Sequence, residues 1–321
     1  MTCSQALVRV AVAGALTSGC GAATTTTGQA PTVPVVSAAT SAPATPATPP
    51  AVTRAVTPAA PAAPSAAPAT SPTAPATPAA TPATPGAVTA APVPLTRSLG
   101  AVTVVLDAGH NGGNATHPRE INRLVEAGGF RKACNTVGAA TDAGYAEHSF
   151  AWDVVLRTAQ ALRQDGLRVV LTRSSDTGVG PCIDQRASVA NRAGARLVVS
   201  VHADGGPASG TGFHVIEPAL APDGGNAAIL NSSDMLARSL RRHFLDGTRE
   251  PYADYLAGGT GLARRSDLGG LNLARIPAAF LECANMRNAG DAGRVSSPRW
   301  RQLAALAVAR AIVDYLQHEG A

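Results

Sequence analysis

Residues 103–110 read TVVLDAGH, a short apolar strand that runs into an aspartate, a glycine and a histidine. Two further apolar strands end in a comparable way, with LVVSVH at residues 197–202 and AAFLE at residues 278–282. In a parallel α/β sheet the carboxyl ends of the strands share one edge, where ligand sites form. We therefore expect two imidazoles and a carboxylate to meet at that edge, which points to a metal-dependent hydrolase.

Strand and helix patterns alternate along the rest of this region. The expected strands lie at 102–107, 167–172, 197–202, 212–216 and 278–283, and the expected helices at 149–164, 183–193, 231–245 and 297–318. Polar, glycine-rich loops are expected up to about residue 146 and over 247–276. This alternation predicts an α/β fold, in which one domain has a mostly parallel twisted β-sheet flanked by helices on both faces.

The N-terminal third of the chain differs from this region in composition. Between residues 20 and 97 Arg54 is the only charged residue, and 17 of the 25 prolines fall there among alanine and threonine. Such a segment has too little large apolar surface to offset the entropy of ordering. We expect 21–97 to be a disordered linker and 98–320 to be the catalytic domain.

Residues 1–20 have the pattern of an export signal. Arg9 precedes a short apolar core at 10–16, and small residues follow up to Cys20. This pattern suits lipoprotein processing, which would leave Cys20 acylated and attach the protein to a membrane, while the core is too short to span a bilayer. Ordinary cleavage among the alanines and a misassigned start codon are the alternatives. In each case we expect export to the cell envelope, in the periplasm or cell wall.

Cysteine usage agrees with export. The domain contains Cys134 and Cys182 in loops, and Cys283 at the end of an apolar strand. A Cys134–Cys182 disulfide is the natural pairing in an oxidising compartment. Three pairings are formally possible, and free thiols are not excluded by the sequence.

The net charge of +5 comes almost entirely from arginine, since Lys132 is the only lysine. The basic residues are scattered, and no aromatic residues accompany them in a patch. Scattered charge usually solvates a surface, so we expect no nucleic-acid partner. An anionic polymer as substrate is compatible with this charge.

The two histidines at strand ends are the first candidate ligands. Gly109 allows a sharp turn that would aim His110 across the sheet edge, and Asp107 could accept a hydrogen bond from its second ring nitrogen. His202 interrupts an apolar run where the strand should emerge. Each could instead be a loop histidine or a buried one satisfied by backbone. His214 alternates with apolar residues and is interpreted as structural.

A catalytic zinc site has three protein ligands and keeps one position open, whereas a structural site has four. Glu147 is the best third ligand, because it opens the 149–164 helix and a rigid element would fix its position. It could instead merely complement the helix dipole. Glu120 and Glu126 are rivals within the glycine-rich loop, and His148 is adjacent.

Glu282 then has a different role. A carboxylate at the end of an apolar strand is costly without a partner, and a zinc-activated water needs a base that later returns the proton to a leaving amine. The alternative is a strand-end carboxylate that reaches solvent. Cys283 faces the opposite side of the strand and is interpreted as a core residue.

Several motifs occur in one order that together resemble a known family. They are LDAGH at 106–110, Glu147 at a helix start, VLTR at 170–173, Arg186 followed by Ala190 and Asn191, VSVHAD at 199–204 and FLE at 280–282. The chain resembles the zinc-dependent N-acetylmuramoyl-L-alanine amidases (amidase family 3), particularly their small actinobacterial, mycobacterial-type members. The resemblance covers about 102–318.

The resemblance implies one zinc ion on His110, Glu147 and His202, with Glu282 as the catalytic carboxylate. It also implies peptidoglycan or muropeptides as substrate, cleaved at the amide between the lactyl group of muramic acid and L-alanine of the stem peptide. We expect a monomer. The rival functions are a zinc peptidase acting on stem peptides and a non-catalytic wall-binding lipoprotein.

The chain departs from the family pattern at several positions. Ala108 stands where proline is common, Asn111 where glycine is common, and CANM at 283–286 replaces the usual residues after the glutamate. No ligand or base is removed, but the substrate contacts stay open. The candidates for these contacts are Asn285, Arg265 and Arg287.

Overall fold

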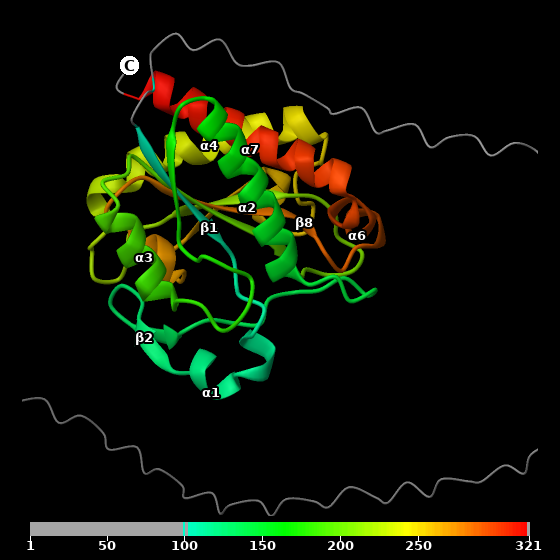
Figure 1. The fold of residues 1–321 in the computed structure, drawn as a ribbon, viewed down its shortest axis with the longest axis horizontal. Coiled ribbons are helices and arrows are strands. Elements are labelled where there is room, and N and C mark those ends of the chain that lie inside the picture. The colour runs from blue at the N-terminus through cyan, green and yellow to red at the C-terminus, as the bar shows by residue number, and fades with distance from the viewer. Residues whose placement is uncertain (1–98, 100–101, 320–321) are drawn as a thin grey trace, which may run out of the picture. The chain divides into compact units, whose positions relative to one another are not determined.

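The computed structural model describes Leu99 and residues 102–319, which Figure 1 draws in colour. The expected signal peptide (1–20), the expected linker (21–97) and Cys20 lie outside these residues. Within the described part, no helix is long and apolar enough to cross a membrane. Nearly all of the domain expected at 98–320 thus has a described fold.

Six strands form the central sheet in the order β4-β1-β5-β8-β6-β7. Their bounds, in that order, are Arg168–Leu171, Thr103–Ala108, Val198–Asp204, Ala278–Asn285, His214–Pro218 and Leu262–Arg265. The strands β4, β1, β5 and β8 are parallel, whereas β6 runs antiparallel to β8 and pairs in parallel with β7. The mostly parallel sheet is therefore confirmed, with one antiparallel junction.

Three long helices cover one face of the sheet and enclose the main apolar core (Figure 1). They are α2 (Glu147–Gln164), α4 (Leu230–Thr248) and α7 (Pro298–His318), and the short α6 (Ala289–Ser296) packs against α7. Alternate strand residues point to this face, including the fully buried Leu106, Val199 and Leu281. Each large side chain buried in this way stabilises the fold by about 1.5–3 kcal/mol.

The opposite face is covered more sparsely, by α3 (Ile183–Arg192) and the single turn α5 (Gly269–Asn272). Small and medium side chains meet there, such as Ala190 beside Val198 and Ala278 beside Leu271. Because these side chains do not fill the space between the helices and the sheet, a cavity opens on this face towards the strand ends. The prediction of helices on both faces is confirmed.

The long loop after β1 is anchored by a hairpin and a disulfide. Its elements are the turn η1 (Asn114–Thr116), α1 (Pro118–Ile121), and the antiparallel strands β2 (Leu124–Glu126) and β3 (Arg131–Ala133). Cys134, directly after β3, is disulfide-bonded to Cys182 at the start of α3, as predicted. Cys283 is free and fully buried, which agrees with its interpretation as a core residue.

The segment 247–276, expected to be loop, contains β7, α5 and the turn η3 (Ala257–Gly259). A further turn, η2 (Ala227–Ile229), precedes α4. These elements have only three or four residues each, so they are too short to show a periodic apolar pattern. The strand β7 forms through its pairing with β6, which lies far from it in sequence.

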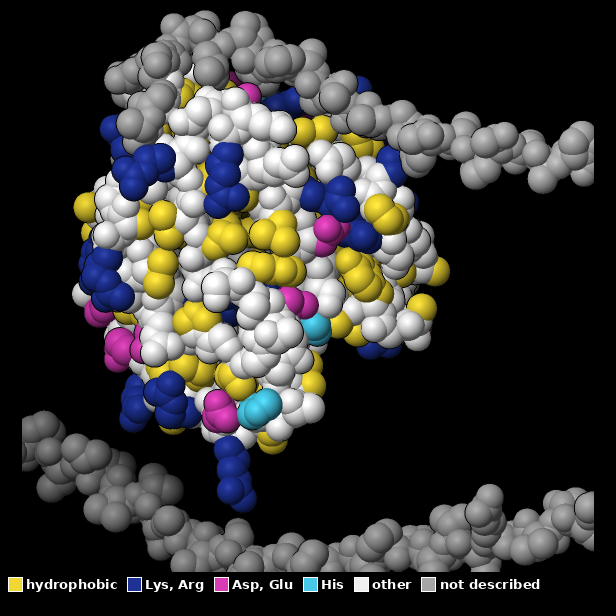
Figure 2. Space-filling model, viewed as in Figure 1, with side chains coloured by type: hydrophobic (Ala, Val, Ile, Leu, Met, Phe, Trp, Pro, Cys, Tyr) yellow, Lys and Arg dark blue, Asp and Glu magenta, His cyan; other side chains and the backbone are white. Residues whose placement is uncertain are grey.

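Basic side chains are dispersed over the surface. On the face shown in Figure 2, basic side chains lie singly or in small groups that apolar and uncharged surface separates. Among all the described residues, several arginines are paired with carboxylates, for example Arg238 with Asp234 and Arg242 with Asp314. This face therefore offers no continuous basic stripe.

Candidate active site

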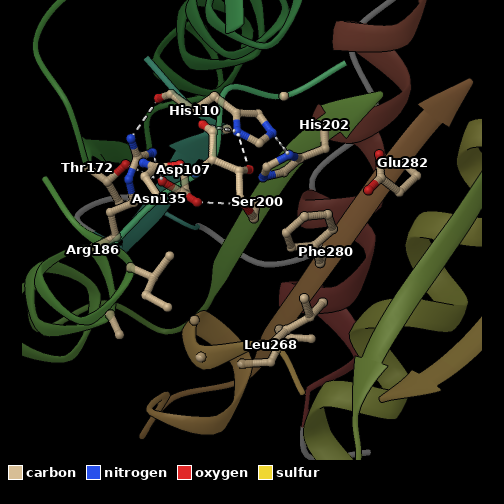
Figure 3. Close-up of a pocket in the computed structure, with 18 of the residues that line it drawn as sticks. Asp107, His110, Asn135, Thr172, Arg186, Ser200, His202, Leu268, Phe280 and Glu282 are labelled. Carbon is tan, nitrogen blue, oxygen red and sulfur yellow. Dashed lines mark hydrogen bonds and ion pairs between the residues drawn. The ribbon is translucent and has the colours of Figure 1, made fainter. Parts of the chain in front are cut away.

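Two histidines and two glutamates converge at the carboxyl-terminal edge of the sheet, and Figure 3 labels three of them, His110, His202 and Glu282. His110 follows β1, His202 lies near the end of β5 and Glu282 on β8. All three, with Glu147 from the start of α2, line one cavity. The predicted meeting of strand ends is thus observed in space.

Gly109 brings the two imidazoles close together. A Cβ atom at this position would lie only 2.2 Å from the His202 ring, so the β1 turn can pass His202 only with glycine. His110 itself has a φ of 56°, in the left-handed region that few non-glycine residues adopt. The ring centroids of His110 and His202 are 4.8 Å apart at an interplanar angle of 82°.

Glu147 lies between these imidazoles. Its Oε1 is 2.7 Å from Nδ1 of His202 and 3.0 Å from Nε2 of His110. Its Oε2 accepts a 2.7 Å hydrogen bond from the backbone N–H of Ala139. Burial alone would raise the pKa of the Glu147 carboxyl, but the two imidazoles hold it below its ordinary value.

These three side chains have the chemistry and spacing to hold a metal ion. The two imidazole nitrogens that face each other are 3.2 Å apart. Ligands at 2.0–2.1 Å around a tetrahedral zinc ion would be separated by about 3.3 Å, close to the observed spacing. The set of two histidines and one carboxylate is also one that catalytic zinc sites use.

Neighbouring groups fix the two histidine rings in this arrangement. Nδ1 of His110 donates to the main-chain carbonyl of Thr136 over 3.0 Å, which leaves Nε2 facing Glu147. The ring of Phe280 stacks on that of His202, with centroids 3.9 Å apart and planes 17° apart. The site is therefore preorganised by its surroundings.

The expected contact between Asp107 and His110 is not formed. Asp107 accepts hydrogen bonds instead from Ser200, at 2.6 Å, from Arg186, at 2.8 Å, and from Thr172. The role predicted for Asp107 belongs to Thr136, because the loop after β1 brings the main-chain carbonyl of Thr136 to Nδ1 of His110. Burial would raise the pKa of Asp107, but Arg186 and the two hydroxyls hold it well below its ordinary value.

Arg186 had not been assigned a role from the sequence, although it was part of the motif set. Its guanidinium donates to the carbonyl of Ala108 at 2.6 Å and to that of His110 at 2.7 Å. It thereby holds the backbone turn that presents His110. In the sequence, Arg186 is singled out only by its place in the ordered set of motifs, because a single buried arginine produces no periodic pattern.

Glu282 faces the same cavity from β8 (Figure 3). Its Oε2 is buried and has no hydrogen-bond partner among the described residues. Burial, and then the negative charges of Glu147 and Asp204, raise the pKa of Glu282 well above its ordinary value. A carboxyl with a raised pKa holds a proton more readily than an ordinary glutamate, which suits a group that accepts and returns one.

The rival ligands lie elsewhere. Glu126 accepts hydrogen bonds from the backbone N–H groups of Gly128 and Gly129 in the β2–β3 turn. Glu120 is exposed on α1. His148 pairs with Asp176 at 2.8 Å, and neither it nor the two glutamates lines the cavity.

The cavity has a volume of about 500 Å³ and two contrasting ends. The polar end carries the candidate ligands and Glu282. The other end extends beneath the sheet between α3 and α5, and its apolar lining includes Ala190, Val198, Leu268 and Leu271. Phe280 lies beside both ends (Figure 3).

The three candidate substrate contacts, Asn285, Arg287 and Arg265, have different surroundings in the structure. Asn285 is fully buried, and its amide donates to the carbonyls of Pro207 at 2.7 Å and Gly210 at 2.8 Å, so it supports the loop after β5. Arg287 pairs with an exposed aspartate outside the cavity. Arg265 pairs with Asp267 at 2.7 Å and does not line the cavity either, but its charge opposes the rise in the pKa of Glu282.

One cavity at the edge of the α/β sheet holds a His–Glu–His group that can bind a metal ion and a further glutamate. This combination places the protein in the class of metal-dependent hydrolases. Comparison with known sequences gives the family. The chain belongs to the N-acetylmuramoyl-L-alanine amidases, whose family model matches residues 104–314.

Two kinds of relative support this assignment. The N-acetylmuramoyl-L-alanine amidase Rv3717 of Mycobacterium tuberculosis is 40% identical over 243 residues, which cover 73% of this chain and 97% of that protein. The crystal structure of the amidase Ami1 from Mycobacterium smegmatis matches with a TM-score of 0.64 and 42% identity, over 68% of this chain and 99% of that one. The apo form of Ami1 from Mycobacterium abscessus matches with a TM-score of 0.62 and 43% identity, over the same shares.

Proposed function

We propose that this N-acetylmuramoyl-L-alanine amidase hydrolyses peptidoglycan with one Zn²⁺ ion held by His110, Glu147 and His202, and with Glu282 as its catalytic carboxylate. The bond cleaved is the amide between the lactyl group of N-acetylmuramic acid and L-alanine of the stem peptide. The observation that carries this proposal is the position of Oε1 of Glu147, within 3.0 Å of a nitrogen from each imidazole and in the cavity that Glu282 lines.

The zinc ion, when bound, supplies Lewis-acid chemistry that polarises the amide carbonyl and makes water a better nucleophile. Glu282 takes a proton from the attacking water and returns it to the nitrogen of L-alanine as the C–N bond breaks. The products are a lactyl carboxylate on the sugar and a free peptide amine. The raised pKa of Glu282 suits a group that must hold a proton between these two steps.

The remaining residues keep the ligands ready for this chemistry. Backbone N–H groups of Ala139 and Ala203 donate to Oε2 and Oε1 of Glu147, at 2.7 and 3.2 Å, which fixes the orientation of its carboxylate. Phe280 limits rotation of His202 by stacking on its ring. We retain Arg265 as a proposed substrate contact, because its side chain is 44% exposed and its charge acts on Glu282, although its guanidinium pairs with Asp267 at 2.7 Å.

An amidase that acts on peptidoglycan works in the cell envelope. We propose that residues 1–20 direct export, that 21–97 link the domain at 98–320 to a lipid-modified Cys20, and that the enzyme is a monomer. The small residues before Cys20 support the lipid anchor. Cys20→Ala should move the protein from the membrane to the soluble fraction, and equal membrane recovery of variant and parent would refute the anchor. Sedimentation analysis of the released protein tests the monomer.

Digestion of purified muropeptides by the full-length protein tests the activity, with chromatography and mass spectrometry of the products. The amidase should release the intact stem peptide with a free L-alanine amine and leave the sugar intact. Glu282→Gln is the matched control, since it removes the proton acceptor at nearly constant shape.

The two rival functions give different products. A peptidase would shorten the stem peptide while leaving it attached to muramic acid. A wall-binding protein would bind the substrate without any turnover in the zinc-loaded state. Either result would exclude the proposed reaction.

A further inference from the structure

Arg173 is a buried arginine that bridges the two segments carrying His110 and Glu147. It lies two residues after β4, and its side chain is only 2% exposed. Its Nη2 donates to the carbonyl of Gly109 at 3.3 Å and to that of His148 at 3.0 Å. Gly109 directly precedes His110, and His148 directly follows Glu147. One nitrogen atom thus joins the backbones beside two of the proposed zinc ligands.

The other N–H groups of Arg173 are used as well. Its Nε donates to the carbonyl of Ala108 at 2.9 Å, and its Nη1 donates to the carbonyl of Ser175 at 2.8 Å and to Oδ1 of Asp176 at 2.9 Å. A guanidinium has five N–H donors in one rigid plane, and here each of them has an acceptor. The ring of Trp152, on α2, packs on this plane, with its centroid 4.7 Å from Cζ. The orientation of the Arg173 side chain is therefore fixed.

The charge of Arg173 is retained and paired. Burial lowers the pKa of Arg173 to about 10, so the guanidinium stays charged at neutral pH. Its partner Asp176 also contacts the first turn of α2, because Oδ2 of Asp176 is 2.8 Å from Nδ1 of His148 and accepts a 3.1 Å hydrogen bond from Ser149. The main-chain carbonyl of Asp176 accepts from the N–H of Gly112, in the loop after β1, at 3.1 Å. Asp176 thus extends the bridge between the same two segments.

Arg186 does not duplicate this bridge. Among the described residues, its hydrogen bonds go to Pro181 and to residues 107–110, and none goes to α2. The turn that both arginines hold contains the left-handed φ of His110, 56°. Such a backbone conformation persists only where the surroundings enforce it. Arg186 therefore supports the turn alone, whereas Arg173 also fixes its distance from the start of α2.

We infer that Arg173 is a positioning residue that sets the separation between His110 and Glu147. This inference rests on the zinc site in the proposed function, but it does not depend on the reaction. The two facing atoms, Nε2 of His110 and Oε1 of Glu147, are 3.0 Å apart. Because the bridge holds the two segments in this arrangement, a zinc ion can bind without first having to order them.

Arg173→Lys tests the inference through zinc affinity. Lysine keeps the positive charge, but its single ammonium group cannot reproduce the planar set of donors that reaches both segments. Zinc affinity should fall roughly 10- to 100-fold, the usual effect of losing an outer contact of metal ligands. Titration of the full-length, metal-free protein with zinc against a competing chelator measures this change.

Arg301→Lys is the matched control. The side chain of Arg301 is also largely buried, at 12% exposed, and it pairs with Asp153 and donates to the carbonyls of Val295 and Ser296. None of these residues lines the cavity. Arg301→Lys should lower the thermal midpoint but leave zinc affinity unchanged. An equal loss of zinc affinity in both variants would show that Arg173 only supports the fold, and would overturn the inference.

Cobalt(II) in place of zinc reports the arrangement of the ligands directly. Its visible absorption bands depend on coordination geometry. In Arg173→Lys these bands should differ from those of the parent protein in position or intensity, whereas in Arg301→Lys they should be the same. Parental bands in Arg173→Lys would contradict the inference.

Asp176→Asn keeps the test decisive if Arg173→Lys does not fold. It removes the negative charge beside Arg173 and His148 but leaves the carbonyl contacts of Arg173, so zinc affinity should fall by a smaller factor than in Arg173→Lys. Parental zinc affinity in a folded Arg173→Lys, or in Asp176→Asn, would overturn the inference. If the parent protein bound zinc but failed to cleave muropeptides, the proposed reaction would fall while these titrations still decided the role of Arg173.

Discussion

Nδ1 of His110 donates a 3.0 Å hydrogen bond to the carbonyl of Thr136. Thr136 lies two residues after Cys134, which is disulfide-bonded to Cys182 at the start of α3. The disulfide therefore restrains the loop that orients a proposed zinc ligand. Loss of the disulfide should therefore weaken metal binding as well as lower the stability of the fold.

Replacing both Cys134 and Cys182 with serine should weaken zinc binding roughly 10-fold or more, because outer contacts of metal ligands contribute about that much. It should also lower stability, since closure of the 48-residue separation is worth ~4 kcal/mol in the loop-entropy account. Titration against a competing chelator and thermal unfolding measure the two effects. Cys283→Ala is the control and should leave zinc affinity unchanged. If the double serine variant bound zinc as tightly as the parent protein, the loop would hold Thr136 in place without the disulfide.

Removal of zinc should abolish turnover while the domain stays folded. A three-ligand site at the edge of a six-stranded sheet is not needed to hold that sheet together. Circular dichroism after chelation should remain near native, and added zinc should restore activity. Full activity after verified metal removal would disprove the mechanism.

Substitution of the two glutamates should separate their roles. Glu282→Gln should retain zinc and lose ~10²–10⁴-fold in kcat, the usual contribution of general acid–base assistance. Glu147→Ala should lose zinc, as should His202→Ala. Metal analysis beside kinetics distinguishes these results, and zinc loss in Glu282→Gln with zinc retention in Glu147→Ala would interchange the two assignments.

Stability should fall as the pH rises from about 5 to 8, through Glu250. This carboxyl shares Arg294 with the fully buried Asp291, and burial raises its pKa from 4.5 to about 7. The folded state therefore binds a proton that the unfolded chain has lost in this window. The stability present below the unfolded pKa is lost as pH rises through the folded pKa, by roughly 3 kcal/mol at most.

Urea unfolding at several pH values checks this slope. Glu250→Gln should flatten it, because an uncharged amide has no proton to lose. An identical slope in the parent and in Glu250→Gln would assign the pH dependence to other groups.

The strand-end residues could be predicted because each combines two local signals, an apolar run and a polar group where the run stops. Glu147 could be predicted from its place at a helix start, which the structure gives as the first residue of α2. The partner of His110 could not, because Thr136 reaches it only through a loop whose path depends on the β2–β3 hairpin and the disulfide.

His214 illustrates a second limit. Its alternation with Phe213 and Val215 predicted a strand residue, and β6 begins with it. Its position opposite Glu282 follows from the antiparallel register of β6 with β8, which no local pattern in the sequence specifies. Asn285 similarly lies on β8 only three residues after Glu282, but its side-chain amide donates hydrogen bonds to the loop after β5.

The antiparallel strand β6 also affects how such a site can diversify. Since β6 starts at the edge where β5 ends, the loop 205–213 leaves one strand and enters another on the same side of the sheet. Insertions or deletions in this loop could reshape the entrance beside Glu282 without shifting the register of either strand. Evolution of new substrate preference could therefore proceed by changes in loop length while the catalytic groups keep their places.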